Sequence, residues 1–459
     1  MDHVDVAVVG GGPAGASAGA AAASAGATTL VLEQGVPRAD RSGLGPDSTD
    51  AAACLDYWID LAGVRYEDIP RELILQKLDS ATFFGPTEHI TIQTTRRASS
   101  CPHFGVTFHR ARFDDWLCRR AEAAGARYLV GNRVTTIDSM LNGRRPQHVL
   151  HLADGSQVAA SAVVLADGPQ RPVTIPTLDQ FLPADLDATS YLSPATANHI
   201  GYQEYRRFPE AVFDPDTIAF WWGWIPGRTA YPWIFPDTAP IARVGLTMPI
   251  GMDLNTIEHR DEYRLLTPAD EQIPRGETYV RRLLETLYGD RYDVETAFPV
   301  VESRGKRFGV EAYPISSTRP IDSPTAANIA VAGGAMGTTS PFHEGGYHLA
   351  LRTGALAGTL AGTDRLAAYN DAWKTTLGAE LGLNVAVAAI VDGYRPRDWD
   401  RAFRVGRSLG IGGHALRYRA FPSAAGLAGL GYLLRYAAKR WQYRNGRYVQ
   451  LPESAYNIP

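Results

Sequence analysis

Six residues near the N-terminus, Gly-Gly-Gly-Pro-Ala-Gly at positions 10–15, stand between a short apolar stretch and an alanine-rich stretch. Gly10 permits a tight turn, and Gly12 leaves room for an anion to approach the backbone. Gly15 lets a following helix pack closely against the preceding strand. Pro13 and Ala14 would begin that helix, whose free N–H groups attract negative charge. The spacing therefore predicts a site for the pyrophosphate of a nucleotide cofactor.

Glu33 stands at the end of the next apolar stretch, residues 28–32, and follows Gly15 by 18 residues. A carboxylate at that place accepts hydrogen bonds from a ribose diol and favours a 2′-hydroxyl over a 2′-phosphate. The elements that must position both features are a strand over 5–9, a helix to about residue 25 and a strand over 28–32. The alternative is a structural unit of this kind without a ligand. The pattern alone does not distinguish NAD from FAD.

A second glycine-rich segment, VAGGAMGTTSPFHEGGYH at 331–348, follows another apolar run and is nearly free of charge. His343 could supply a proton to a reaction beside this backbone. Glu344 is expected to cap the helix that begins at about residue 345, because acids stabilise a helix N-terminus. His348 lies inside that helix and is expected to be a packed residue.

Three aromatic residues alternate in the segment YPWIFP at 231–236: Tyr231, Trp233 and Phe235. In a strand this spacing puts all three rings on one face. Such a wall suits a long apolar ligand, and Tyr231 is a second candidate proton donor. Packing in a sheet core is the alternative for each ring, because aromatic residues are common in strands.

Periodicity divides the chain into three parts. Residues 1–170 and 311–365 are expected to form one discontinuous α/β unit, with a helix over 113–124, buried strands near 163–168 and 327–332, and few clear elements over 36–100. Residues 171–310 are aromatic and proline-rich and predict an antiparallel sheet. Residues 366–459 predict a helical region. The fold class is therefore α/β, or α+β overall.

The bulk composition excludes several classes. The 459 residues contain no uninterrupted apolar stretch of 18, and three widely spaced cysteines argue against disulfides and metal sites. A cytoplasmic protein without a nucleic-acid partner is expected. Residues 401–459 contain ten Lys or Arg and one acid, Glu453. The net charge of this tail is therefore about +9, and that of the rest of the chain is about −13. The tail is a candidate for peripheral contact with an anionic membrane; the alternative is docking on the protein's own acidic body.

Further segments resemble the glutathione-reductase-type FAD proteins, in the branch with the p-hydroxybenzoate hydroxylase fold. Arg110-x-x-Phe-Asp-x-x-Leu looks like the segment whose arginine reaches FAD, and Ala-Asp167-Gly168 looks like that branch's Ala-Asp-Gly turn. Val134 stands where the family's backbone contacts adenine. The resemblance covers roughly residues 1–170 and 310–360 and implies a Rossmann-type FAD-binding domain.

The aromatic segment at 231–236 is similar to the Tyr-x-Trp-x-Phe-Pro motif of the geranylgeranyl reductase family. That resemblance implies saturation of isoprenoid double bonds by hydride from N5 of reduced FAD. Electrons would come from NAD(P)H or from a small redox protein. Flavin-dependent halogenases carry a related Trp-x-Trp-x-Ile-Pro strand and a catalytic lysine, for which Lys77 is the nearby candidate. A halogenase, an aromatic hydroxylase and a noncatalytic lipid carrier are the alternatives.

Two departures from the family pattern concern the cofactor site. Gly333-Gly334 replaces a Gly-Asp pair whose aspartate binds the ribityl chain, and the acid of the later Pro-x-x-Gly-Glu-Gly motif stands one place early, at Glu344. The N–H groups of Gly345 and Gly346 are expected to face the pyrimidine end of the flavin. The loop cysteine of archaeal relatives is missing from residues 38–49, and Cys54 lies further on.

Overall fold

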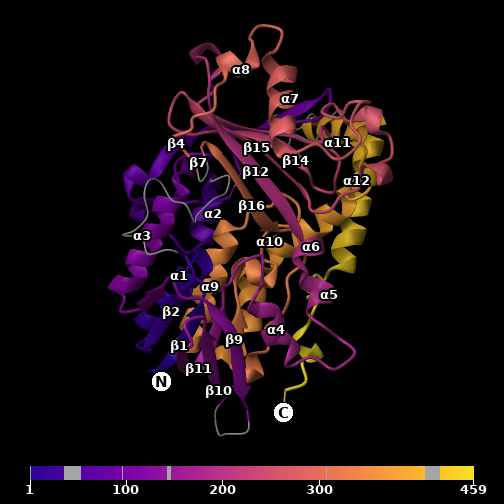
Figure 1. Ribbon diagram of the computed structural model, residues 1–459. Helices are drawn as coiled ribbons and strands as arrows, with labels where there is room; N and C mark the ends of the chain where they lie inside the picture. Colours follow the sequence, from indigo (N-terminus) through magenta and orange to yellow (C-terminus); the bar gives the residue numbers. More distant parts are fainter. Residues whose placement is uncertain are drawn as a thin grey trace.

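The computed structural model describes residues 2–35, 53–95, 97–141, 146–305, 308–408 and 424–458. Seven of the described strands form a first sheet, in the order β8-β2-β1-β11-β10-β9 with β17 also paired to β11 (Figure 1). The pairs β1–β2, β1–β11, β2–β8 and β11–β17 are parallel, whereas β9, β10 and β11 pair in antiparallel fashion. The strands are β1 (Asp2–Val9), β2 (Thr29–Glu33), β8 (Arg127–Val130), β9 (Val134–Met140), β10 (Gln147–Leu152), β11 (Gln157–Leu165) and β17 (Ile329–Val331).

Three helices complete the nucleotide-type unit: α1 (Pro13–Ser24), α3 (Arg110–Ala123) and α9 (Tyr347–Gly362). α1 and α9 pack with their backbones in close approach. A Cβ atom on Gly354 would lie 2.0 Å from the Ala14 carbonyl oxygen, and one on Gly358 would lie 2.1 Å from that of Ala18. The two glycines stand one turn apart on α9 and therefore fix how closely the C-terminal half of the unit meets the N-terminal half.

A second sheet has the order β16-β12-β15-β14-β13-β5-β6. Its described strands are antiparallel except for the parallel pair β5–β13. The strands are β5 (Ser80–Phe84), β6 (His89–Ile92), β12 (Asn198–Arg207), β13 (Thr217–Trp221), β14 (Tyr231–Pro236), β15 (Ile241–Pro249) and β16 (Val310–Ser316). Thus β5 and β6, from the segment in which the sequence showed few elements, lengthen this sheet. The three-part division of the chain stays a prediction.

The remaining described elements cover these sheets. A small sheet of order β3-β7-β4 consists of β3 (Ala53–Leu55), β4 (Ile74–Leu78) and β7 (Gly105–Phe108). α7 (Gly276–Tyr288) packs on β12 and β15 through Tyr279, Val280, Leu283 and Leu284, a spacing that forms one apolar face. The short helices are α2 (Asp56–Leu61), α4 (Thr174–Asp179), α5 (Thr189–Leu192), α6 (Pro194–Ala197) and α8 (Val294–Ala297).

The C-terminal region is helical, with α10 (Tyr369–Val391), α11 (Pro396–Ser408) and α12 (Ala424–Gln442). Leu366–Val391 is long and apolar enough, by length and composition, to cross a membrane, but 56% of its most apolar window is buried inside the protein. After α12 the chain returns to the first sheet's core, where Tyr448, Leu451 and Tyr456 are buried and Leu451 bridges to Ile321. The last residues are therefore part of the core.

Candidate active site

A cavity of about 910 Å³ extends along the protein between the two sheets. One part of its wall is formed by Gly12, Pro13 and Ala14 at the start of α1 and by Gly168 after β11. Another part is formed by the rings of Tyr231, Trp233 and Phe235 on β14, together with Phe220 and Trp222. The cavity therefore joins the predicted phosphate site to the predicted aromatic wall.

The glycine turn has the shape that an anion needs. Gly10 has φ +99°, and a Cβ there would lie 2.4 Å from the Ala166 carbonyl oxygen. A Cβ on Gly15 would lie 1.8 Å from the Gly10 carbonyl oxygen, whereas one on Gly12 would meet nothing within 4 Å. α1 begins with Pro13, and neither a side-chain cap nor an acid occupies its first turn. The open face at Gly12 and the uncapped helix N-terminus fit a pyrophosphate.

Of the two predicted adenosine contacts, Glu33 lies beside this turn and Val134 lies on another strand of the first sheet. Glu33 accepts hydrogen bonds from the Gly11 N–H at 2.6 Å and from the Gly35 N–H at 2.7 Å, so its carboxylate is fixed at the end of β2. Val134 begins β9, and its side chain is buried in the first sheet's core. The ribose and adenine contacts of these residues stay predictions.

Arg110 begins α3 and lines the cavity. Its Nε donates to Asp114 Oδ1 at 2.9 Å, and its guanidinium lies 4.6 Å from the centre of the Tyr347 ring. Burial alone would lower the pKa of Arg110, but the Asp114 carboxylate holds it above the usual value. Arg110 is thus a fixed cation on the cavity wall, as the predicted cofactor contact requires.

The Asp167-Gly168 turn contributes its backbone to the cavity. The Asp167 carboxylate accepts from the N–H groups of Val173 at 2.8 Å and Thr174 at 2.9 Å, and from the Thr174 hydroxyl. It therefore holds the segment that leads into α4, and burial raises its pKa. Gly168 has φ +78° and a Cβ there would meet nothing within 4 Å. Of this predicted pair, Gly168 lines the cavity and Asp167 shapes the turn.

Arg171 is a residue that the sequence reasoning missed. It is fully buried, and its guanidinium donates to Gly334 O at 3.0 Å and to Ala335 O at 3.1 Å. Burial lowers its pKa to about 10. Its other acceptors are Pro169 O, Leu192 O, Asn198 Oδ1 and Ser316 Oγ. Arg171 thus clamps the loop that lacks the family's aspartate, and a lone arginine in sequence gives no sign of such a network.

The loop at Gly333 and Gly334 is tightly packed. Gly333 has φ +63°, and a Cβ there would lie 2.8 Å from the Ala14 Cβ. A Cβ on Gly334 would lie 3.2 Å from Pro169 Cδ, so an aspartate there would require Pro169 to shift. The loop takes the form of the 3-10 turn η8 (Gly333–Met336), and Gly334 lines the cavity. The loop therefore meets the cavity without a carboxylate at position 333 or 334.

The prediction that Glu344 caps the following helix is wrong. Its φ of +58° turns the side chain away from α9 and onto the second sheet, where the side chain is only 1% exposed. Its Oε1 accepts from the hydroxyls of Ser317 at 3.2 Å and Thr229 at 3.3 Å, and Oε2 accepts from Thr247. The tertiary partners of a buried carboxylate outweigh the attraction of a helix N-terminus.

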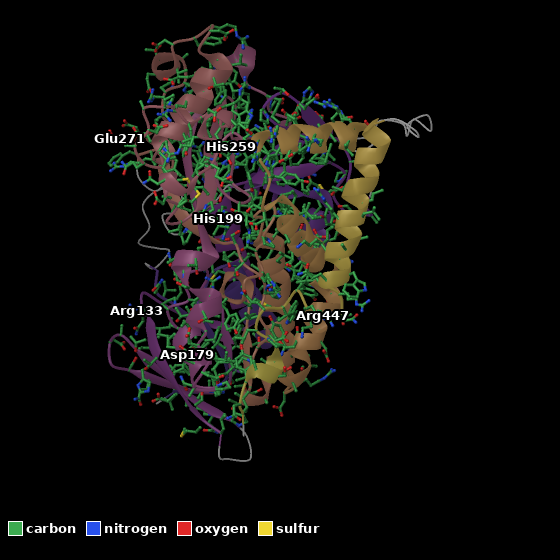
Figure 2. All side chains as sticks on the ribbon, turned by 90° about the vertical axis from the view of Figure 1, so that its right-hand side faces the viewer. Arg133, Asp179, His199, His259, Glu271 and Arg447 are labelled. Carbon is green, nitrogen blue, oxygen red and sulfur yellow. The ribbon has the colours of Figure 1, made fainter. Side chains whose placement is uncertain are left out.

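His199 completes the group around Glu344. Its Nδ1 lies 2.5 Å from Glu344 Oε1, but no aligned hydrogen bond joins the two, so the contact is an ion pair when the imidazole is protonated. His199 is buried, and Figure 2 labels it at about mid-height of the molecule. Glu344 thus anchors the loop at 340–346 to β12 and β15.

His343 is half-buried, and its imidazole is neutral. It stacks on Trp58 with 4.8 Å between ring centres, and its Nδ1 accepts from the Gly345 N–H at 3.1 Å. Burial lowers its pKa to about 4. The Gly345 N–H thus already has an acceptor within the protein; Gly345 and Gly346 both line the cavity, and their contact with the flavin stays a prediction. His348 is buried in α9 as expected and also stacks on Trp58.

The aromatic residues of β14 alternate as predicted. Tyr231 and Trp233 lie 6.1 Å apart between ring centres, Trp233 and Phe235 lie 5.9 Å apart, and all three line the cavity. Across the sheet, a Cβ on Gly245 would lie 2.6 Å from the Trp233 ring, so the glycine makes room for it. The Tyr231 hydroxyl donates to the His343 carbonyl at 2.6 Å. Tyr231, Trp233 and Phe235 thus pack against one another and also form part of the cavity wall.

Comparison with known proteins agrees with this geometry. The family model described as FAD dependent oxidoreductase matches residues 5–169. The chain is 24% identical over 392 residues to a digeranylgeranylglycerophospholipid reductase of Methanococcus aeolicus, covering 81% of this chain and 82% of that one. It is also 24% identical over 413 residues to the enzyme of that name from Methanosarcina mazei, covering 84% of each chain.

The solved structures share the fold. A geranylgeranyl bacteriochlorophyll reductase-like protein from Thermoplasma acidophilum superposes with a TM-score of 0.68 at 19% identity, over 97% of this chain and 99% of that one. The flavin-dependent halogenase CmlS superposes with a TM-score of 0.56 at 16% identity, over 96% of this chain and 77% of that one. The FAD-type turn, the aromatic cavity and the reductase-named relatives agree, and the chain belongs to the geranylgeranyl reductase family of FAD-dependent oxidoreductases.

Proposed function

We propose that this protein is an FAD-dependent reductase that saturates carbon–carbon double bonds of an isoprenoid lipid or prenyl chain. The observation that carries the proposal is the single cavity that joins the glycine turn of α1 to the aromatic wall of β14. Its relatives named digeranylgeranylglycerophospholipid reductases support the same class of reaction. A long, mostly apolar cavity suits a prenyl chain.

The chain's own residues would act by binding and positioning. When bound, reduced FAD supplies the hydride for one alkene carbon. The α1 N-terminus holds the pyrophosphate, and Arg110 and Gly346 line the space that the rest of the cofactor requires. Tyr231, Trp233 and Phe235 orient the apolar chain and exclude water.

The proton for the second carbon has two candidate holders on this wall. Burial raises the pKa of Tyr231 well above its usual value, so its phenol keeps the proton that it shares with the His343 carbonyl. His343 is neutral at ordinary pH because burial lowers its pKa to about 4. Burial makes both neutral groups weak acids, but a neutral imidazole is intrinsically a weaker acid than a phenol, and we therefore favour the Tyr231 hydroxyl over His343 as the proton donor.

A direct test uses dithionite-reduced protein and a geranylgeranyl lipid. The expected result is a gain of two mass units per double bond; no gain with any prenyl compound would refute the proposal.

The alternative, a monooxygenase or halogenase, is favoured by structural neighbours such as CmlS. Lys77, the candidate halogenase lysine, is exposed on β4 and does not line the cavity. Substrate-dependent oxygen consumption would support the alternative. NAD(P)H or a small redox protein is the proposed electron donor.

Peripheral membrane contact through α12 is part of the proposal. Leu433, Leu434 and Trp441 of this helix are 52%, 62% and 59% exposed. Arg435 and Arg440 are exposed beside them. Exposed apolar side chains among basic ones suit an anionic bilayer surface. The variants Leu434→Glu and Trp441→Glu should reduce sedimentation with anionic vesicles; point variants are needed because residues after α12 belong to the core.

A further inference from the structure

Part of the cavity wall is polar and includes one side chain that reaches solvent. It is formed by Tyr57 of α2, Arg97 after β6, and Glu380 and Asn384 of α10, which we call the mouth cluster. Glu380 and Asn384 stand one helical turn apart and therefore share a face of α10. The Arg97 side chain is 48% exposed, whereas the aromatic rings of β14 are at most 6% exposed. The mouth cluster thus marks the end at which a polar group would remain beside water.

Charges in the mouth cluster are already balanced. Arg97 NH1 lies 3.1 Å from Glu380 Oε2, and the Tyr57 hydroxyl donates to Glu380 Oε1 at 3.0 Å. The Arg97 guanidinium also lies 4.3 Å from the centre of the Tyr57 ring. Among the described cavity-lining residues the other arginine, Arg110, is paired with Asp114. A phosphate bound here would stand beside the buried Glu380 carboxylate, and the two negative charges would repel each other.

Asn384 has a donor that lacks an acceptor. Its side chain lines the cavity, the residue is 5% exposed, and its Nδ2 has no hydrogen-bond partner within the described part of the chain. A buried amide donor without an acceptor costs free energy, and an acceptor from outside the protein would remove that cost. The Nδ2 atom itself is buried, but Asn384 lines the cavity, so an oxygen on a molecule bound there would supply the acceptor once the amide turns toward it.

We propose that the mouth cluster binds the head group of the substrate, and that this head group is uncharged and presents a hydroxyl or carbonyl oxygen to Asn384 Nδ2. This inference rests on the proposed prenyl reduction. It separates the protein from its relatives whose name specifies a glycerophospholipid. The apolar chain extends from this end along Tyr231 and Trp233, and the head group fixes how far it enters.

The test compares three ligands of equal chain length on the FAD-loaded protein: geranylgeraniol, geranylgeranyl diphosphate and a prenyl hydrocarbon without a head group. Dissociation constants are measured from the change in flavin absorbance. The alcohol should bind at least tenfold more tightly than the diphosphate. Asn384→Leu should weaken binding of the alcohol about tenfold, equivalent to about 1.4 kcal/mol. The same substitution should leave the dissociation constant of the hydrocarbon unchanged.

A charge variant gives the complementary result. Glu380→Gln removes the carboxylate and leaves the Arg97 charge uncompensated, so the diphosphate should bind about tenfold more tightly than it binds to the unmodified protein. Flavin content and thermal unfolding of each variant serve as folding controls. Equal or tighter binding of the diphosphate by the unmodified protein, or equal weakening of alcohol and hydrocarbon by Asn384→Leu, would overturn the head-group assignment. Failure of all three ligands to bind would instead refute the proposed function.

Discussion

Replacing Glu344 with glutamine tests whether this residue positions the glycine loop for FAD. The substitution keeps the size of the side chain and removes its charge. The carboxylate now has Thr247 on one oxygen, Ser317 on the other and His199 Nδ1 at 2.5 Å. An amide offers one acceptor oxygen, and its NH₂ group would face either hydroxyl donors or the imidazole. At least one buried contact must be lost.

The magnitude follows from burial. Because the Glu344 side chain is only 1% exposed, solvent cannot replace the lost contact. A buried polar group left without its partner costs about 1–3 kcal/mol, and we expect about 2–3 kcal/mol here because a charged acceptor is removed. For a chain of 459 residues the entropy of unfolding is roughly 1 kcal/mol per kelvin, so Tm should fall by about 2–3 °C.

The decisive measurement is FAD affinity by titration of the apoprotein. Glu344→Gln should weaken FAD binding about tenfold, because the adjacent Gly345 and Gly346 lose their fixed position. Glu311→Gln is the matched control: Glu311 is also buried on the second sheet, where it accepts from Gln203 Nε2 at 2.6 Å, but it does not line the cavity. The control should lower Tm without changing FAD affinity. Unchanged FAD affinity in Glu344→Gln would refute the positioning role.

Three further predictions address the rest of the structure. Gly12→Ala should keep the apoprotein's Tm and weaken FAD binding, because its Cβ enters only open space, whereas Gly15→Ala should unfold the turn because its Cβ would lie 1.8 Å from the Gly10 carbonyl oxygen; equal Tm values for both would contradict this reading. Arg171→Lys should lower the free energy of unfolding by about 3 kcal/mol, measured in urea, since an ammonium cannot reach the guanidinium's acceptors. Burial lowers the pKa of His148 to about 4, so the unfolded chain binds a proton that the folded protein does not. Stability should fall as pH drops from 6.5 to 4, and His148→Gln should make that fall in Tm smaller without abolishing it, because His109 and His343 are shifted in the same direction.

Local pattern predicted the elements that depend on neighbouring residues. The strand at 5–9, the helix after Gly12 and the strand ending at Glu33 are confirmed to within a few residues as β1, α1 and β2. The alternation of Tyr231, Trp233 and Phe235 along β14 is also confirmed. These features depend on turn geometry and on the alternation of side chains along a strand, and both are determined by residues close together in the sequence.

Long-range pairing was not readable from the same sequence. β5 joins β13 over more than a hundred residues, and no local signal in 80–84 specifies that partner. The wrong prediction for Glu344 has the same origin, because its partners come from β12, β15 and the end of β16. The expectation about residues 38–49, from which the loop cysteine of the resembled family is missing, concerns a segment outside the described residues.

The sequence by itself determined the nucleotide-type glycine turn and the aromatic strand, because a phosphate turn and a strand face are set by the spacing of near neighbours. Only the tertiary structure decided what surrounds them. It placed the buried Arg171 guanidinium on the loop without an aspartate, turned the Glu344 carboxylate onto the second sheet and brought Glu380 and Asn384 of α10 to the cavity. Each of these groups is buried and polar, and a buried polar group takes its position from partners that the fold supplies from distant segments.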